Sequence, residues 1–270
     1  MGRIADTFVR QRAENRKLLI PYIVAGDPDL DTSLEVMHKM VAAGADLIEL
    51  GVPFTDPEAE GPSIQLGHER ALKNSVSLRD TVNLVARFRE KNNQTPVILM
   101  GYVNPIDAMG YNTFASIAAD AGVDGTLIVN LPPEEGAALN VELSAHGLDA
   151  IYLLSPTTTD KRAQFICSAA RGFIYYVSLK GTTGASTINF GQVEARVKHL
   201  KAFTDVPMVV GFGIKDGASA ARVAAFADGS VVGTAIVDIF QVHAQSPSKI
   251  APLVAELLVD MRQQMDAINY

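Results

Sequence analysis

The sequence predicts an α/β protein, a single-domain (β/α)8 barrel with an extra N-terminal helix. Short apolar segments rich in β-branched residues alternate about eight times with longer segments of helical period, at intervals of roughly 25–30 residues. No Ser-, Gly- or Pro-rich tract and no shift in composition divides the chain, so we expect residues 1–270 to form one domain. A doubly wound open sheet is the competing architecture, and it usually has fewer strands per domain.

The strands are expected where apolar segments lie between turn residues. In chain order they are 18–24, 46–50, 96–101, 125–130, 149–154, 173–178, 206–212 and 230–234. The helices are expected at 1–17, 32–45, 77–92, 113–125, 134–147, 160–172, 191–203, 217–227 and 248–267. Asp31 or Thr32 is the expected cap of the helix after the first strand. The segment "GTAIVDIF" predicts a last strand that ends in the N-terminus of a short helix.

The composition excludes several classes of protein. The 270 residues are 48% apolar and 20% charged, so the chain can bury a large core. Its net charge of −7 argues against binding to nucleic acid or to anionic membranes. No apolar segment approaches the roughly 18 residues of a membrane span. The single cysteine, Cys167, and the polar start predict a cytoplasmic protein without disulfides. The five histidines lack zinc-ligand spacing, and we expect no metal.

Glu49, at the end of the second expected strand, is a candidate acid/base. In barrels of this kind the loops after the strands build the active site. Side chains alternate along a strand, so Glu49 and Leu47 share one face. If that face lines the barrel interior, desolvation raises the carboxyl pKa and suits Glu49 to proton transfer. The alternative is a glutamate that forms a salt bridge at the rim.

The loop "PFTDPEAEGP" offers Glu60 as a second carboxylate. This loop is long enough to fold back over the mouth of the barrel. There Glu60 would accept a hydrogen bond from a substrate N–H or stabilise developing positive charge. The alternative is a solvated loop acid.

Three glycine-rich turns after the last three strands, at 178–186, 211–217 and 232–238, predict a phosphate site. Successive backbone N–H groups in such turns form an anion-binding nest, a helix N-terminus adds its dipole, and barrels frequently hold phosphate after strands seven and eight. The predicted phosphate-binding residues are Gly184, Gly213, Gly233 and Thr234.

The expected pocket between these two regions is apolar and aromatic. Its predicted lining residues are Tyr22, Met100, Leu127, Val129, Leu153, Tyr175, Phe212 and Val232. Such a pocket suits a flat apolar ring joined to a phosphate. The residues alone therefore predict an enzyme that acts on a small aromatic phosphate ester through a carboxylate acid/base, without a metal.

Six segments, in order and at matching spacing over nearly the whole chain, resemble the tryptophan synthase α subunit family. They are "ENRKLLIPYIVAGDPD", "GADLIELGVPFTDPEAEGPSIQ", "PVILMGYVNPI", "GVDGTLIVNLPPEE", "GTTG" and "VGFGI". The resemblance implies a lyase of tryptophan biosynthesis that cleaves indole-3-glycerol phosphate to indole and glyceraldehyde 3-phosphate. It also implies a β subunit partner in an αββα complex, with pyridoxal phosphate in the β subunit and no cofactor in this chain.

The same resemblance implies roles for individual residues. Glu49 matches the family's acid/base for a retro-aldol cleavage. Thr183 matches the threonine of a mobile loop that closes over the substrate, within the 178–192 segment, and the glycines of "GTTG" would let that loop move. The four predicted phosphate-binding residues match the family's phosphate positions. Tyr175 and Phe212 match the wall beside the indole ring.

The chain also departs from the family pattern. Glu60 stands where Asp is usual, and its additional methylene moves the carboxylate by about 1 Å, a displacement that can lower a rate by about 10²-fold. Glu58 replaces an apolar residue, Asn130 an Asp and Thr182 a Val. Three alternatives stay open, two from these departures and one from the late glycines. They are a weakened α-like subunit that binds ligand and regulates a β partner, a stand-alone lyase that releases indole, and another phosphate-binding barrel such as a sugar-phosphate isomerase.

Overall fold

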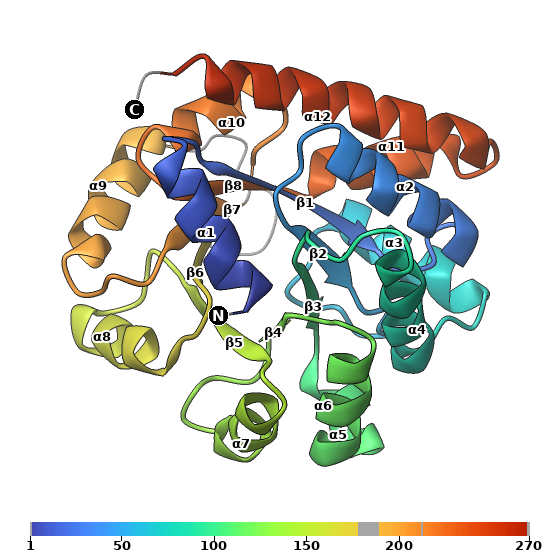
Figure 1. Ribbon diagram of the computed structural model, residues 1–270, viewed down its shortest axis with the longest axis horizontal. Coiled ribbons are helices and arrows are strands. Elements are labelled where there is room, and N and C mark those ends of the chain that lie inside the picture. Colours follow the sequence, from blue (N-terminus) through green and yellow to red (C-terminus); the bar gives the residue numbers. More distant parts are fainter. Residues whose placement is uncertain (1, 178–188, 212, 269–270) are drawn as a thin grey trace.

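The computed structural model, which describes residues 2–177, 189–211 and 213–268, is a closed barrel of eight parallel strands in sequence order (Figure 1). The strands are β1 Leu18–Val24, β2 Ile48–Gly51, β3 Val97–Gly101, β4 Gly125–Ile128, β5 Asp149–Leu154, β6 Ile174–Val177, β7 Met208–Gly211 and β8 Gly229–Val232. Pairing of β8 with β1 closes the barrel. The predicted (β/α)8 fold is confirmed, and the open sheet is excluded.

Most helices surround the strands on the outside of the barrel, and the first helix lies across the N-terminal end of the barrel (Figure 1). The helices are α1 Arg3–Ala13, α2 Leu30–Ala42, α3 Pro62–Lys73, α4 Leu78–Arg89, α5 Val103–Met109, α6 Tyr111–Asp120, α7 Ala137–Ala145, α8 Asp160–Ala169, α9 Phe190–Lys201, α10 Gly217–Ala224, α11 Thr234–His243 and α12 Ile250–Asp266, with a short 3₁₀ helix at Pro247–Lys249. No helix in the described ranges is both long and apolar enough to cross a bilayer.

Two helices, α3 and α5, were not among the expected elements, and one predicted cap was wrong. The buried face of α3 includes Gly67 and His68, so its apolar period is weak in the sequence. Its start is marked by Gly61 followed by a proline in the first turn, where the missing N–H costs nothing. Helix α2 is capped by Asp29, whose carboxylate accepts from the Thr32 N–H at 2.7 Å, and not by Asp31 or Thr32.

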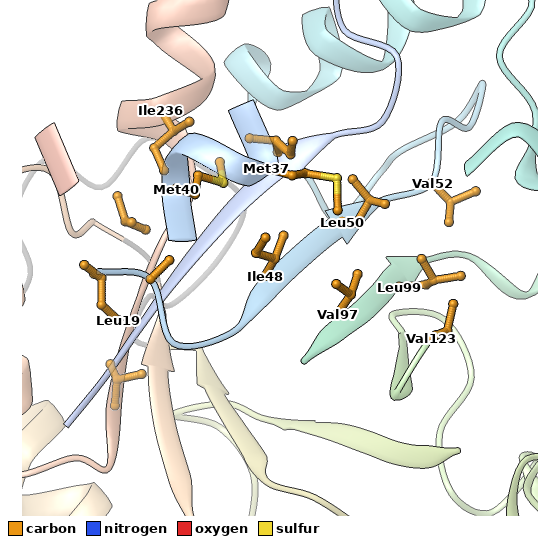
Figure 2. Close-up of a cluster of buried hydrophobic side chains, with 14 of the residues drawn as sticks. Leu19, Met37, Met40, Ile48, Leu50, Val52, Val97, Leu99, Val123 and Ile236 are labelled. Atoms are coloured by element: carbon orange, nitrogen blue, oxygen red, sulfur yellow. The ribbon is translucent and has the colours of Figure 1, made fainter. Parts of the chain in front are cut away.

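Strand alternation sorts the apolar side chains into an inner and an outer layer. The inner cluster fills the barrel, and α1 adds Ile4 and Phe8 to it. The outer cluster packs between strands and helices, as Figure 2 shows for the Ile48 and Leu50 side chains of β2 beside Met37 of α2. Because Leu47 belongs to the inner cluster, Glu49, two residues further along, points into the barrel as well.

Three aspartates fix the strands at the N-terminal end of the barrel. Asp46, Asp124 and Asp228 each lie just before a strand, and each accepts a hydrogen bond of 2.8 Å from a backbone N–H of the preceding strand, those of Leu19, Val97 and Met208. Arginine or lysine side chains pair with all three. This end therefore stabilises the barrel, and the chemistry is left to the opposite end.

Candidate active site

Glu49 lies near the C-terminal end of β2 and is only 1% exposed. It is in register with Tyr22 of β1 and Ile98 of β3. Its Oε1 atom has no hydrogen-bond partner within the described part of the chain. Burial, and secondarily the charge of Glu60, raises the pKa of Glu49 to about 8. At neutral pH this side chain therefore holds a proton that it can donate.

Glu60 reaches the same pocket from the loop between β2 and α3. It is 6% exposed, and burial raises its pKa to about 7. The Tyr102 hydroxyl accepts a hydrogen bond from the Ala59 N–H at 3.0 Å, and Gln65 Nε2 donates to the Glu60 carbonyl at 2.9 Å. The Phe54 ring stacks on Tyr102, with 4.9 Å between centroids. The loop is thus fixed over the barrel mouth, and the alternative of a solvated loop acid is excluded.

A pocket opens between these carboxylates and the ends of β7 and β8. Its lining, within the described ranges, is Tyr22, Glu49, Glu60, Ile64, Met100, Tyr175, Gly213, Ile214, Val231, Gly233 and Thr234. The structure thus brings together both predicted carboxylates, three of the four predicted phosphate residues and three of the eight predicted wall residues. A ligand in this pocket would contact carboxyl groups at one end and glycine turns at the other.

The glycine turns after β7 and β8 have backbone features that favour anion binding. Gly213 has a φ of +72°, which a residue with a Cβ rarely adopts. Gly233 is the N-cap of α11, so the first N–H groups of this ten-residue helix lie at the pocket with the exposed Thr234. Gly184, Thr183 and Phe212, together with most of the 178–192 segment, lie outside the described residues, so their predicted roles stay predictions.

Four of the predicted wall residues do not line this pocket. One of them points to the outside of the barrel, and the other three lie on the inner side but away from the pocket. Val232 is fully buried in the outer layer, between strand and helices. Val231 lines the pocket instead, because the odd-numbered residues of β8 point into the barrel and the even-numbered ones point outward. Leu127 is fully buried in the inner cluster and is not among the lining residues. Val129 and Leu153 border that cluster but line a second pocket, at the ends of β4 and β5.

Sequence reasoning missed His68, which is 2% exposed on α3. The Phe54 N–H donates to its Nδ1 at 3.1 Å, and its Nε2 lies 3.4 Å from the Tyr22 hydroxyl. Burial lowers the pKa of His68 to about 4, so the ring is neutral at neutral pH. The signal that could have located it is the start of a helix at Gly61-Pro62, which places His68 about two turns into that helix.

Among the described residues, no cluster of three or more His, Cys, Asp or Glu side chains could hold a metal ion.

Gly51, at the end of β2, makes room for the Tyr22 hydroxyl. A Cβ at this position would lie 2.3 Å from that oxygen. We expect Gly51→Ala to displace the Tyr22 ring and to lower the free energy of unfolding by about 1–3 kcal/mol, as overpacking does. Urea denaturation measures the loss. Adding Tyr22→Phe removes the oxygen, but the ring carbon Cζ, 2.8 Å from the same Cβ, stays, so this change should restore only part of the loss. A double variant as unstable as the single one would contradict this packing.

The chain is similar along its length to proteins of one family. A family model described as "Tryptophan synthase alpha chain" matches residues 8–267. The tryptophan synthase alpha chain of Thioalkalivibrio sulfidiphilus is 54% identical over 98% of this chain and 100% of its own length, and that of Nitrosococcus oceani is 50% identical over 99% and 98%. A crystal structure of tryptophan synthase subunit alpha from Legionella pneumophila superposes with a TM-score of 0.92 at 44% identity and covers 99% of this chain and 100% of its own.

Proposed function

This chain belongs to the tryptophan synthase alpha chain family, and from that membership we propose that it catalyses the lyase half-reaction, the retro-aldol cleavage of indole-3-glycerol phosphate to indole and glyceraldehyde 3-phosphate. The family makes it an enzyme of tryptophan biosynthesis. The observation that supports the half-reaction is the pair of buried carboxyl groups, Glu49 and Glu60, in one pocket with the glycine turns.

Glu49 acts first as an acid in this proposal. Its raised pKa keeps the carboxyl protonated, and it gives that proton to the indole carbon that bears the side chain. The protonated ring carries a positive charge that is delocalised onto its nitrogen. The Glu60 carboxylate accepts the hydrogen bond of the ring N–H and stabilises that charge.

Glu49 then acts as a base. Its carboxylate takes the proton of the side-chain hydroxyl next to the ring, and the oxygen electron pair forms the carbonyl of glyceraldehyde 3-phosphate. The carbon–carbon bond breaks, and its electron pair returns to the ring and neutralises it. One proton is given and one is recovered, so the enzyme ends in its starting state without a metal or cofactor.

The phosphate of the substrate binds at the turns after β6, β7 and β8. Gly213, Gly233 and Thr234 supply N–H and hydroxyl donors beside the N-terminus of α11, and Gly184 is proposed to complete the set. Thr183 is proposed to close the pocket from the adjacent loop. Tyr22, Met100 and Tyr175 form the described part of the wall for the indole ring.

We further propose a tryptophan synthase β subunit as partner, in an αββα complex in which only the β subunit carries pyridoxal phosphate. The support is the membership of the tryptophan synthase alpha chain family and the similarity to tryptophan synthase of M. tuberculosis, which has a TM-score of 0.85 at 33% identity. Glu58 and Asn130, two of the positions that depart from the family pattern, are exposed, and we propose that they alter the contact with that partner.

The proposed function is tested by indole release from indole-3-glycerol phosphate, measured on the isolated chain and again with β subunit added. Release in either case supports the lyase, and no release in both would contradict it. Glu60→Asp separates the lyase from the regulatory alternative. A large gain in rate would show a chain weakened by Glu60, and an unchanged rate supports an active enzyme.

The pH dependence of kcat/KM follows from the two carboxyl groups. Glu60 must be ionised, so we expect the rate to fall as the pH drops below about 7, the pKa of Glu60. Glu49 must be protonated, so the rate falls as the pH rises above about 8. A profile recorded from about pH 5 to about pH 10 should peak between these values. Glu60→Gln should remove the acid limb and keep the alkaline one, moved to lower pH because the charge of Glu60 no longer raises the pKa of Glu49. A flat wild-type profile would contradict the assignment.

A further inference from the structure

We propose that His68 is a positioning residue that acts through Tyr22, and that the Tyr22 hydroxyl donates a hydrogen bond to the substrate side-chain oxygen from which Glu49 takes the proton. This inference rests on the proposed function. It adds to the two carboxylates a neutral donor for the oxygen that becomes the aldehyde. As the proton leaves, negative charge develops on this oxygen, and a fixed O–H donor stabilises it.

The directions of the hydrogen bonds follow from the backbone. The Phe54 N–H can only donate, so His68 Nδ1 accepts it, at 3.1 Å. A neutral imidazole that accepts at Nδ1 carries its proton on Nε2. Nε2 therefore donates to the Tyr22 oxygen, 3.4 Å away. The proton of the Tyr22 hydroxyl must then point elsewhere.

Tyr22 has no second hydrogen-bond partner in the described ranges that could accept this proton. The residue is 3% exposed and lines the pocket. Its register partner on β2 is Glu49, whose Oε1 also lacks a partner there. The pocket thus holds an unused donor and an unused acceptor on adjacent strands. A substrate hydroxyl between them would accept from Tyr22 and donate to Glu49.

The ring of Tyr22 spans the distance between the phosphate turn and β2. A Cβ on Gly233 would lie 3.6 Å from Tyr22 Cδ1, and a Cβ on Gly51 would lie 2.3 Å from its hydroxyl oxygen. One edge of the ring is therefore at the phosphate turn, and its hydroxyl is at the end of the strand that carries Glu49. The three-carbon chain between phosphate and indole has to cross this interval, so its reacting oxygen passes the Tyr22 hydroxyl.

His68 offers a matched pair of variants, because each of its two hydrogen bonds can be kept separately. In His68→Asn the amide oxygen takes the place of Nδ1 and still accepts from Phe54, but the side chain no longer reaches Tyr22. In His68→Gln the longer amide still donates to Tyr22 but no longer serves Phe54. If His68 acts by holding the loop at Phe54, kcat/KM should fall in the Gln variant. If it acts through Tyr22, kcat/KM should fall in the Asn variant.

We expect Tyr22→Phe and His68→Asn each to lower kcat/KM for indole release by about tenfold, the effect of one lost hydrogen bond. His68→Gln should stay within about threefold of wild type. The double variant Tyr22→Phe/His68→Asn should be no slower than Tyr22→Phe alone, because both changes remove the same interaction. Multiplicative losses in the double variant, or a damaged Gln variant beside an unaffected Asn variant, would overturn the proposal.

A second measurement needs no variant. Nitrogen-15 NMR of the wild-type chain reports the His68 tautomer, and we expect the Nε2–H form; the Nδ1–H form would overturn the proposal. The two levels of inference can fail separately. A wild-type chain that releases indole while Tyr22→Phe keeps full kcat/KM contradicts this inference alone. A wild-type chain without indole release, alone or with β subunit, contradicts the proposed function and with it the substrate named here.

Discussion

Replacing Glu49 with Gln is expected to lower kcat/KM for indole release by roughly 10²–10⁴-fold, the usual contribution of a general acid/base. Gln has nearly the same shape, so it fits the same buried site, but it can neither give a proton to the ring nor take one from the hydroxyl. Binding of the substrate phosphate, at the other end of the pocket, should be little affected. The loss should therefore appear mainly in kcat.

The same substitution is expected to make the stability less dependent on pH. The unfolded chain ionises Glu49 near its ordinary pKa of 4.5, whereas the folded chain keeps the proton until about pH 8. As the pH rises through this interval, the wild-type free energy of unfolding falls, because only the unfolded state gains by ionising. The Gln variant has no carboxyl group at this position, so its free energy of unfolding lacks this dependence on pH. Its stability relative to wild type should rise by roughly 4 kcal/mol from about pH 4 to about pH 8, at about 1.4 kcal/mol per pKa unit.

Two measurements on one pair of proteins check these expectations, namely indole release and urea denaturation at both pH values. Glu58→Gln is the matched control, since Glu58 is an exposed acid two residues before Glu60. It should leave both the rate of the isolated chain and its pH-dependent stability unchanged. A relative stability of the Glu49 variant that stayed constant with pH would mean that Glu49 is ionised in the folded protein.

The largest loss of stability is expected from Arg70→Met. Arg70, on α3, forms two hydrogen bonds of 2.7 Å with the carboxylate of Asp27, which is 1% exposed in the turn after β1. Without Arg70 this carboxylate is buried and unpaired, at a cost of about 3–5 kcal/mol. Burial already raises the pKa of Asp27 and Arg70 opposes it, so the variant should be less destabilised at acid pH, where Asp27 is protonated.

Urea denaturation at pH values below and above neutrality measures this effect. Asp27→Asn/Arg70→Met removes the charge as well and should regain a large part of the stability. Arg87→Met is the matched control, because its partner Asp31 is 86% exposed, and such a surface pair contributes at most about 1 kcal/mol. Equal losses in the two arginine variants would mean that the Asp27 pair is no more than a surface contact.

The sequence predicted the fold class, the first strand and the inner face of β2 because each depends on the pattern of residues that are close together in the chain. Strand–helix alternation predicted the closed barrel, and the strand from 18 to 24 was predicted at its observed bounds. The side-chain period of two placed Glu49 and Leu47 on the inner face. In β8 the same reasoning chose Val232 in place of Val231, because both faces of a parallel strand are buried, and two adjacent valines do not reveal which one points inward.

The sequence by itself determined the fold class, the acid at the end of β2 and the glycine turns after β7 and β8. Only the tertiary structure decided that Glu60 is buried beside Glu49, that His68 reaches Tyr22 across 46 residues of sequence, and that Val129 and Leu153 line a different pocket. The reason is physical. Periodicity depends on neighbours along the chain, whereas the pKa of a carboxyl group depends on every atom that excludes water from it, and most of those atoms are distant in sequence.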